Sequence, residues 1–477
     1  MKNPMHGALS FSEKADVVKF VSENNVKIMN LCHVPEDGRL KTLSFSVSNK
    51  GRVKEILEFG ERVDGSNLFS FIEPGKSDIY IVPRLDRAFI NPFSIVPSLN
   101  VLCDYLDEHG KPLDVAPKSV LSRAEERLRS SNGVVLKALA ELEFYVVAAE
   151  REGEMLFPGA PDRNYHESAP FTRFEGLRNE VLVALAGVGI GTKYGHSEVG
   201  WVLGKDNTVM EQQEVEFLPQ GLAEMAETIA VAKWVIRNTC VKYGASASFS
   251  PKVSLEHAGN GLHVHLCGLK NGENVVANPN GSLSAEALKM IGGILKFAPS
   301  LCAFGNPTPV SYLRFAARKE SPMTVCWSAR NRLALVRIPL WWSFKKGSIE
   351  KDSCRETFEY RAPDPFANAY LLFAGIAVAA NYGLDHSEEA LKIAEDLHVE
   401  ASGKRRRLRV LPHSCCESAK RLRKDRRSYE ANGVFPKKLV DKTLEKLRGY
   451  RDKDLWKNLA DKPDKVASIL KQYLHYG

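Results

Sequence analysis

The sequence lacks the features of an exported or membrane-bound protein. The residues from Met1 to Lys14 contain no apolar core of a signal peptide. The longest apolar run begins at Ala369 and is short for a membrane span, so it predicts a buried helix. The nine cysteines are scattered and include the neighbours Cys415 and Cys416, which fits no disulfide framework. We therefore expect a cytoplasmic protein with no membrane partner.

Further absences narrow the chemistry. The sequence contains no Walker phosphate loop and no Rossmann glycine pattern, so a nucleotide would have to be held in another way. It also contains no internal repeat and no low-complexity tract. The net charge is +8, with basic runs at 404–409 and 420–427. No aromatic residues are interleaved with these runs, which favours solvated helix faces or subunit contacts over nucleic acid.

Length and patterning predict two folded units. The 477 residues are 44% hydrophobic and 26% charged, as in an ordinary globular protein long enough for more than one domain. Residues 16–106 show short strand-like segments and one helical stretch, 51–63, which predicts a small α+β unit. Glycine and proline in 107–117 mark a boundary. Residues 117–477 mix strands with long helices and end in a charged helical region, so we expect a larger second domain there.

Polar residues two apart in apolar surroundings are the main chemical signal. Residues i and i+2 of a strand share one face, so each such pair faces one way. Buried carboxylates need cations, a metal or one another to offset their desolvation. The pairs are Glu141 with Glu143, His263 with His265, and Glu359 with Arg361.

These pairs favour a hard divalent cation. Many carboxylates with few nitrogens suit Mg²⁺ or Mn²⁺ rather than zinc. The segments 195–200 and 210–217 add His196, Glu198, Glu211 and Glu214. A zinc site built on His263, His265 and Cys267, which continue one alternation, is the alternative.

Arginines complete the signal. Forked guanidinium groups suit phosphate and carboxylate oxygens, so arginines near a metal held by carboxylates predict a nucleotide-phosphate site. The candidates are Arg314, Arg332 and Arg337. Because Arg332 and Arg337 are five residues apart, a regular strand cannot aim both at one ligand, and we expect a loop at one of them.

An ordered series of motifs resembles the glutamine synthetase family of the prokaryotic type, including its gamma-glutamylamine ligases. The motifs are VDGS, SDIYIVPRLDRAFINPF, ELEFYVV, GHSEVG, QQEVEF, SFSPKVSLEHAGNGLHVHLCG, NPTPVSYLRFAARKESP, ARNRLALVRIP and FEYRAPDPFANAYL. They run in the family's order from about Asp16 to the end of the sequence. The resemblance implies an N-terminal β-grasp domain and a catalytic domain with an antiparallel sheet funnel backed by helices. It also implies a homo-oligomeric ring, usually two stacked hexamers.

The resemblance also implies roles for single residues. It assigns Glu143, Glu198 and Glu214 to one metal, and Glu141, His263 and Glu359 to the other. Arg314 and Arg361 resemble the clamps on the glutamate α-carboxylate, and Gly259 resembles part of the glutamate site. His265, Arg332 and Arg337 match phosphate-side residues. Glu320 matches the flap glutamate, and Asp64 and Asp78 match two β-grasp aspartates, of which Asp64 would take a proton from the amine in the next subunit.

Some positions depart from the family pattern. Ala258 stands where an asparagine usually helps to hold glutamate, and Thr357 replaces an arginine near the nucleotide phosphates, where Arg355 would have to substitute. The segment WVLGKDNTV predicts an extended hairpin beside the metal site. Arg409 stands where a modifiable tyrosine occurs in some members, so we expect no adenylylation there.

The sequence therefore predicts an ATP-dependent glutamate–ammonia ligase that uses Mg²⁺ or Mn²⁺. Such an enzyme would phosphorylate the γ-carboxylate of glutamate and let ammonia displace phosphate. A gamma-glutamylamine ligase that takes a larger amine shares every step except the nucleophile. The remaining alternatives are a non-catalytic structural relative and a zinc hydrolase.

Overall fold

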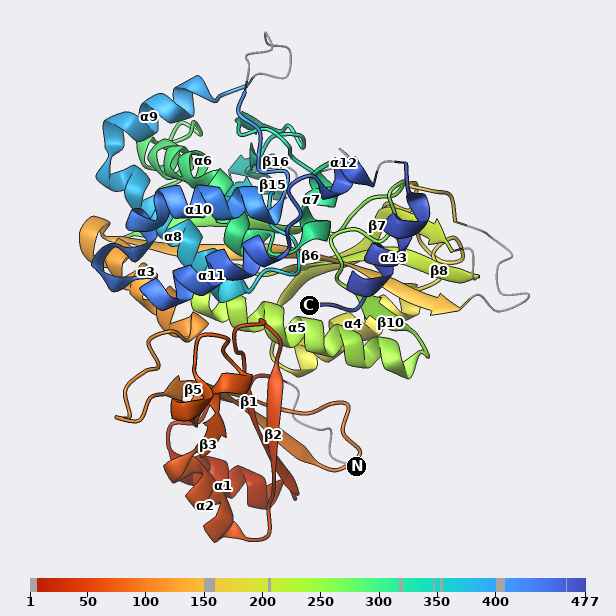
Figure 1. Cartoon of the computed structure of the whole chain (residues 1–477). Coiled ribbons are helices and arrows are strands. Elements are labelled where there is room, and N and C mark those ends of the chain that lie inside the picture. Colours follow the sequence, from red (N-terminus) through yellow and green to blue (C-terminus); the bar gives the residue numbers. More distant parts are fainter. Residues whose placement is uncertain are drawn as a thin grey trace.

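A computed structural model describes residues 7–149, 159–204, 207–316, 321–345, 348–351, 355–399, 408–459 and 461–477. The chain forms two units, a small one at the N-terminus and a large one that contains the remaining helices and sheets (Figure 1). Strand β5 (Ser98–Leu106) ends the small unit, and helix α3 (Pro117–Asn132) begins the large one.

The small unit is a five-stranded mixed sheet. The strand order is β2-β1-β5-β4-β3, with only β1 and β5 parallel. The other strands are β1 (Ile28–His33), β2 (Lys41–Ser46), β3 (Glu61–Asp64) and β4 (Asp78–Ile90). One face of the sheet packs its apolar side chains against two helices, α1 (Lys14–Glu23) and α2 (Lys50–Phe59).

The expectation of a single helix in the small unit was wrong. Helix α2 corresponds to the predicted stretch, but α1 precedes the first strand as a second helix. Its apolar residues Val17, Val18, Phe20 and Val21 have the spacing of one helical face and are buried. The segment is short, and the strand-like residues that follow it obscure its helical periodicity.

The large unit contains a ten-stranded sheet. Its main path runs β13-β14-β17-β11-β6-β8-β7, and all pairs except β13 with β14 are antiparallel. The path strands are β13 (Trp327–Ala329), β14 (Val336–Ile338), β17 (Phe358–Tyr360), β11 (Leu262–Lys270), β6 (Val134–Ala149), β8 (Thr208–Phe217) and β7 (Thr192–Leu203). The short strands β9 (Gln220–Gly221) and β10 (Ser246–Ser248) pair with β6, and β12 (Glu273–Asn274) pairs with β11. A separate hairpin joins β15 (Trp342–Lys345) to β16 (Ser348–Lys351).

Helices back this sheet and bury its apolar face. They are α3, α4 (Glu175–Gly187), α5 (Leu222–Lys242), α6 (Ala285–Gly305), α7 (Pro309–Ala316), α8 (Ala369–Asp385), α9 (Ser387–Asp396), α10 (Cys415–Glu430), α11 (Lys437–Gly449), α12 (Leu455–Asn458) and α13 (Pro463–Tyr473). Helices α6 and α8 touch backbone to backbone, because a Cβ on Gly293 would lie 2.1 Å from the carbonyl oxygen of Ala379. The predicted buried helix from Ala369 is confirmed as α8.

One helix in the described part of the chain, α6, is long and apolar enough to cross a membrane. Most of it (83% of its most apolar window) is buried inside the protein. A core helix passes the same test of length and composition, and the packing of α6 against α8 identifies it as one.

Candidate active site

Strand β6 lies at the centre of the site, because it pairs with β11 on one side and β8 on the other. The register places Glu141 directly opposite His263. The Oε2 atom of Glu141 lies 2.8 Å from Nδ1 of His263, and its Oε1 atom lies 2.9 Å from Nε2 of His265. One carboxylate thus joins both histidines, which share a face of β11 as the alternation predicted.

Glu359 brings a third strand into this group. It lies on β17, and its Oε1 atom is 3.8 Å from Nδ1 of His263. Two arginines bind it: Arg337 Nη1 lies 2.7 Å from Oε2, and Arg361 bonds to Oε1. Donor atoms of Glu141, His265 and Glu359 lie within 4.8 Å of one another, close enough to hold one ion.

A second group lies on the hairpin of β7 and β8. His196 Nδ1 is 3.7 Å from Glu198 Oε2, and His196 Nε2 is 3.4 Å from Glu214 Oε1. Donor atoms of these three residues also lie within 4.8 Å of one another. Glu143 connects the two groups, since it is the register partner of Glu214 and lies 3.7 Å from Nδ1 of His263.

The pKa values of the first group indicate charged carboxylates. Burial opposes the charge of Glu141, but hydrogen bonds from His263 and His265 outweigh it and hold its pKa well below the usual range. Burial also opposes the charge of Glu359, and the neighbouring Arg361 lowers its pKa. Burial, aided by Arg361, lowers the pKa of His263 to about 4, so this imidazole is neutral at pH 7 and has a lone pair available for a metal.

The second group has no such compensation. Burial raises the pKa of Glu214 well above its ordinary value, and the charges of Glu141, Glu143 and Glu198 raise it further. Crowded, buried carboxylates of this kind are relieved by a cation. The donors are mainly carboxylate oxygens with single imidazoles, so the residues fit Mg²⁺ or Mn²⁺ better than zinc.

A buried amide fixes the loop before β11. The side chain of Gln212 donates to Glu143 Oε2 at 3.0 Å, to Asn260 Oδ1 at 3.1 Å and to the Gly259 carbonyl at 3.3 Å, and it accepts from Gly200 N–H at 3.0 Å. The Gly261 amide also donates to Glu143 Oε2 at 2.8 Å. The glycine loop and Glu143 therefore form one hydrogen-bonded unit. A Cβ on Gly259 would lie 2.2 Å from the Pro251 carbonyl oxygen, so this close approach requires glycine.

The arginines lie in different settings. Arg314 is on α7, buried beneath the histidines: its Nη1 donates to the Ala362 carbonyl at 2.9 Å and its Nη2 lies 3.4 Å from His263 Nε2. Arg337 is on β14, whereas Arg332 lies in the turn between β13 and β14. The expectation of a loop at one of these two positions is therefore confirmed.

Several predicted residues lie apart from these groups. Asp64 is in the small unit, where its carboxylate accepts hydrogen bonds from Ser66 and Asn67 of its own loop. Asp78 is its register partner on β4. Glu211 faces away from Glu214 and accepts from Gln213 and the Arg173 amide. Glu320 lies outside the described residues.

The departures from the family pattern have identifiable neighbours. The Ala258 backbone accepts a hydrogen bond from the Tyr145 hydroxyl at 2.7 Å, and its side chain is buried. The Thr357 hydroxyl lies 3.3 Å from Nδ1 of His265, while Arg355 is exposed. Among the described residues, Cys267 joins neither metal-suited group, which argues against the zinc alternative.

Sequence reasoning missed a ring cluster beside the second group. The rings of Tyr165 and His166 stack with centroids 4.1 Å apart, and His166 lies 4.2 Å from the ring of His196. Partial burial raises the pKa of Tyr165, and its ring centroid lies 5.3 Å from that of His196, beside the second group. These residues lie in a loop with no periodicity. In the sequence, the only indication of this ring cluster is that Tyr165 and His166 are adjacent.

Fold and site together define a class: an α+β protein with a β-grasp unit and a second unit whose sheet gathers acidic residues suited to divalent cations. Comparison with known proteins identifies the family. Residues 25–108 match the glutamine synthetase β-grasp domain, and residues 114–448 match the glutamine synthetase catalytic domain. The chain therefore belongs to the glutamine synthetase family.

Individual relatives agree on the family and differ in name. Glutamine synthetase of Thermotoga maritima is 30% identical over 430 residues, covering 88% of this chain and 93% of the relative. A protein of Cupriavidus pinatubonensis named 3-hydroxylaminophenol mutase is also 30% identical, covering 90% and 94%. A cryoEM structure of Plasmodium falciparum glutamine synthetase has the same fold, with a TM-score of 0.77 and 20% identity over 94% of this chain and 97% of that one.

Proposed function

We propose that this protein is an ATP-dependent carbon–nitrogen ligase that joins ammonia to the γ-carboxylate of glutamate. The observation that supports it best is the pair of carboxylate groups around Glu141 and Glu214, bordered by Arg337 and Arg361. An acid must be activated before nitrogen can replace its oxygen, and a site for that step must balance phosphate charge with cations. The proposed reaction does not require a membrane, and we place the activity in the cytoplasm.

Two divalent cations would be held by residues from five strands, β6, β7, β8, β11 and β17. Glu143, Glu198 and Glu214 would hold one, and Glu141, His263 and Glu359 the other. The neutral imidazole of His263 and the charged carboxylate of Glu141 are in the protonation states that ligands need. When bound, Mg²⁺ or Mn²⁺ would neutralise charge on the phosphate and carboxylate oxygens.

The chain's own side chains would bind the two substrates. His265, Arg332 and Arg337 would contact the phosphates of ATP, and the position of Arg332 in a turn would let its side chain adjust to them. Arg314, Arg361 and Gly259 would bind glutamate. The buried guanidinium of Arg314 is fixed by the Ala362 and Pro363 carbonyls, so it would position the loop and His263 as much as bind the α-carboxylate.

The reaction balances in two displacements. A γ-carboxylate oxygen of glutamate attacks the γ-phosphorus of ATP, the bond from phosphorus to the bridging oxygen breaks, and ADP leaves. The amine nitrogen then attacks the carbonyl carbon of γ-glutamyl phosphate. Phosphate leaves with the former carboxylate oxygen, and the amine loses its proton to a carboxylate base. Glu320 would close the site against water during these steps.

That base would come from a neighbouring subunit. Within one chain, the described contacts of Asp64 are to its own loop in the β-grasp unit. We therefore propose a homo-oligomeric ring, with two stacked hexamers as the expected form, in which Asp64 of one subunit completes the site of the next. This arrangement would make the isolated subunit inactive.

The alternative is a gamma-glutamylamine ligase that takes a larger amine. Two observations support this alternative. Ala258 stands where the family usually has an asparagine, and the exposed residues Tyr165 and His166 lie beside the second group. Exposed aromatic rings bind alkylammonium groups.

An amine panel tests the proposal. ADP release and product mass would be measured with glutamate, ATP and Mg²⁺, using ammonia, methylamine, ethanolamine, putrescine and benzylamine. Glutamine formed from ammonia at the highest kcat/KM supports the proposal. Turnover of a larger amine but not ammonia would select the alternative. If none of the amines supports ADP release, both proposals are contradicted, and the protein would be a non-catalytic relative.

A further inference from the structure

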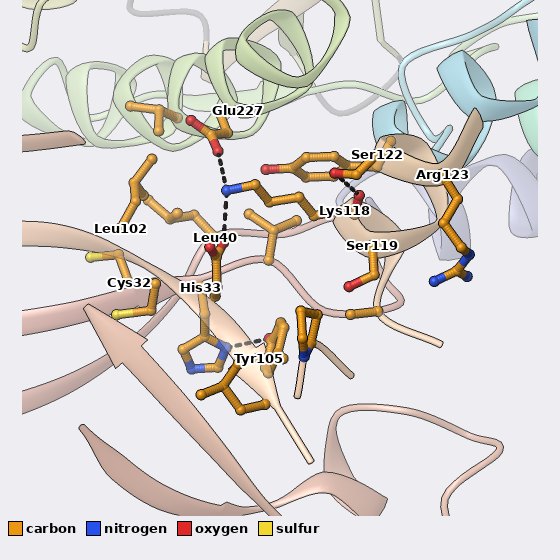
Figure 2. A pocket seen from close by; sticks show the side chains of 18 residues that line it. Cys32, His33, Leu40, Leu102, Tyr105, Lys118, Ser119, Ser122, Arg123 and Glu227 are labelled. Atoms are coloured by element: carbon orange, nitrogen blue, oxygen red, sulfur yellow. Dashed lines mark hydrogen bonds and ion pairs between the residues drawn. The ribbon is translucent and has the colours of Figure 1, made fainter. Parts of the chain in front are cut away.

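A cavity of about 430 Å³ lies between the two units and shares no lining residue with the site described above. Strands β1 and β5 of the β-grasp unit form one side (Figure 2). Helices α3, α5 and α8 of the catalytic unit form the other. The volume lies within the range of small-molecule sites. All the residues that line the cavity belong to the part of the chain that the structure describes.

Most of the cavity wall is apolar. The side chains include Cys32, Leu40, Leu102, Val231 and Tyr370. Polar groups gather at one end, where the ammonium of Lys118 lies 2.7 Å from Asp104 and 3.3 Å from Glu227 (Figure 2). An apolar chamber with few converging polar groups is the common form of a ligand site.

The polar end keeps unused hydrogen-bonding capacity. An ammonium has three N–H donors, and the contacts of Lys118 with described residues use two of them. Ser119 lines the same wall, and its hydroxyl bonds to no described residue. Glu227 is 3% exposed; Arg84 bonds to its Oε1 atom, while its Oε2 atom accepts no hydrogen bond from the described part of the chain and has Arg87 Nε 3.7 Å away. A buried carboxylate oxygen normally accepts a hydrogen bond, so Oε2 has capacity left for a ligand donor.

Each charge of the wall already has an opposite charge beside it. Lys118 lies against Asp104, Arg84 and Arg87 lie against Glu227, and Arg123 pairs with Asp114. His33 adds no charge at pH 7, because burial lowers its pKa to about 4 while its Nδ1 stays 2.5 Å from the Tyr105 hydroxyl. A ligand with net charge would disturb this balance in a partly buried place. The wall therefore suits an uncharged ligand that offers an acceptor next to a donor.

We propose that this cavity binds a small, uncharged molecule with an apolar body and a carboxamide-like group. Its carbonyl oxygen accepts from Lys118 or Ser119, and its N–H donates to Asp104 or Glu227. Because the walls belong to both units, the ligand favours the relative orientation in which those walls enclose it. Since Asp64 lies on the β-grasp unit, the cavity is placed to regulate the ligase through that orientation.

Binding of benzamide to the full-length protein tests the proposal, with benzoate and benzylamine as the charged comparators. Ligand-observed NMR and calorimetry would give the dissociation constants. We expect saturable binding of benzamide at one site per chain, with both charged probes at least about tenfold weaker. Ser119→Phe fills the cavity without breaking a hydrogen bond and should weaken benzamide binding at least about tenfold. Ser130→Phe, on the exposed side of the same helix, should not.

The outcomes separate cleanly. Equal binding of all three probes, no saturable binding of benzamide, or unchanged benzamide affinity in Ser119→Phe would overturn the proposal. If Ser119→Phe does not fold, judged by its thermal transition, the smaller Ser119→Leu is tested to the same criterion. These measurements need no turnover, so they can fail while the proposed ligase activity stands, and the reverse also holds.

Discussion

The carboxylate of Glu141 and the imidazole of His263 face each other across neighbouring antiparallel strands, with 2.8 Å between Oε2 and Nδ1. Their contact depends on strand register, since a shift of one residue would turn either side chain to the opposite face of the sheet. The buried apolar residues between the polar positions, such as Leu142 and Val264, hold that register. The sheet core thus determines the geometry of the site.

Substitution of Glu141 should remove metal binding from the first group. Glu141→Gln deletes the charge that joins both histidines while keeping the side-chain volume. Loss of a ligand should cost at least about 100-fold in Mn²⁺ affinity, beyond what an outer partner usually costs. Titration with Mn²⁺ followed by electron paramagnetic resonance would measure it. Affinity within about threefold of the parent would contradict the assignment, provided that Glu224→Gln, a control on α5, is unchanged.

Chelation should distinguish hard cations from zinc. A hard-cation site exchanges readily, so dialysis against EDTA should abolish activity, and Mg²⁺ or Mn²⁺ should restore it. Metal analysis of the protein as purified should show less than one zinc per chain. Zinc at one per chain that survives the chelator would instead support a site on His263, His265 and Cys267.

Gly261 should tolerate no side chain. A Cβ there would lie 2.5 Å from Nε2 of His263 and 2.7 Å from Nη2 of Arg314. Gly261→Ala should displace the imidazole and lower kcat/KM by about 100-fold, with a loss of about 1–3 kcal/mol in the free energy of unfolding. Gly75→Ala, where a Cβ meets no atom within 4 Å, is the matched control for steady-state kinetics and denaturant unfolding.

Gln212 should act as a positioning residue. Its amide connects Glu143 to the glycine loop, so Gln212→Met should weaken Mn²⁺ binding by about 10- to 100-fold and raise the KM for glutamate. Gln213→Met breaks a comparable buried network on the opposite face, with Arg178 and Glu211. Both variants should lose stability, but only the first should lose metal affinity. Equal metal affinities in the two variants would exclude the positioning role.

Acid should destabilise the β-grasp unit through His33. Its pKa is about 4 in the folded protein and 6.5 when unperturbed, so between these values the unfolded chain binds more protons. The free energy of unfolding should therefore fall by about 1.4 kcal/mol for each pH unit as pH decreases from 6.5 to 4. In His33→Phe, the free energy of unfolding measured with urea should fall by about 1.4 kcal/mol less for each pH unit over this range. Tyr105→Phe should keep the slope, whereas an unchanged slope in His33→Phe would show that another group causes it.

Strand alternation in the sequence predicted which polar residues share a face. It could not show which strands are neighbours, because β6 pairs with both β8 and β11, and the β6–β11 partners lie at least 120 residues apart in the sequence, as Leu142 and Leu262 do. Loop residues such as Tyr165 and His166 carry no period, so their stacking could not be predicted. The ligand sets came from the family resemblance, and their assignment to separate metals remains a prediction.

Oxygen transfer from glutamate to phosphate tests the central claim most directly. Glutamate labelled with ¹⁸O in its γ-carboxylate would be incubated with ATP, Mg²⁺ and the best amine of the panel. The mass of the released phosphate would then be measured. If γ-glutamyl phosphate forms, each turnover moves one labelled oxygen from glutamate to phosphate. Phosphate released without ¹⁸O, alongside an amide product, would contradict the proposed chemistry.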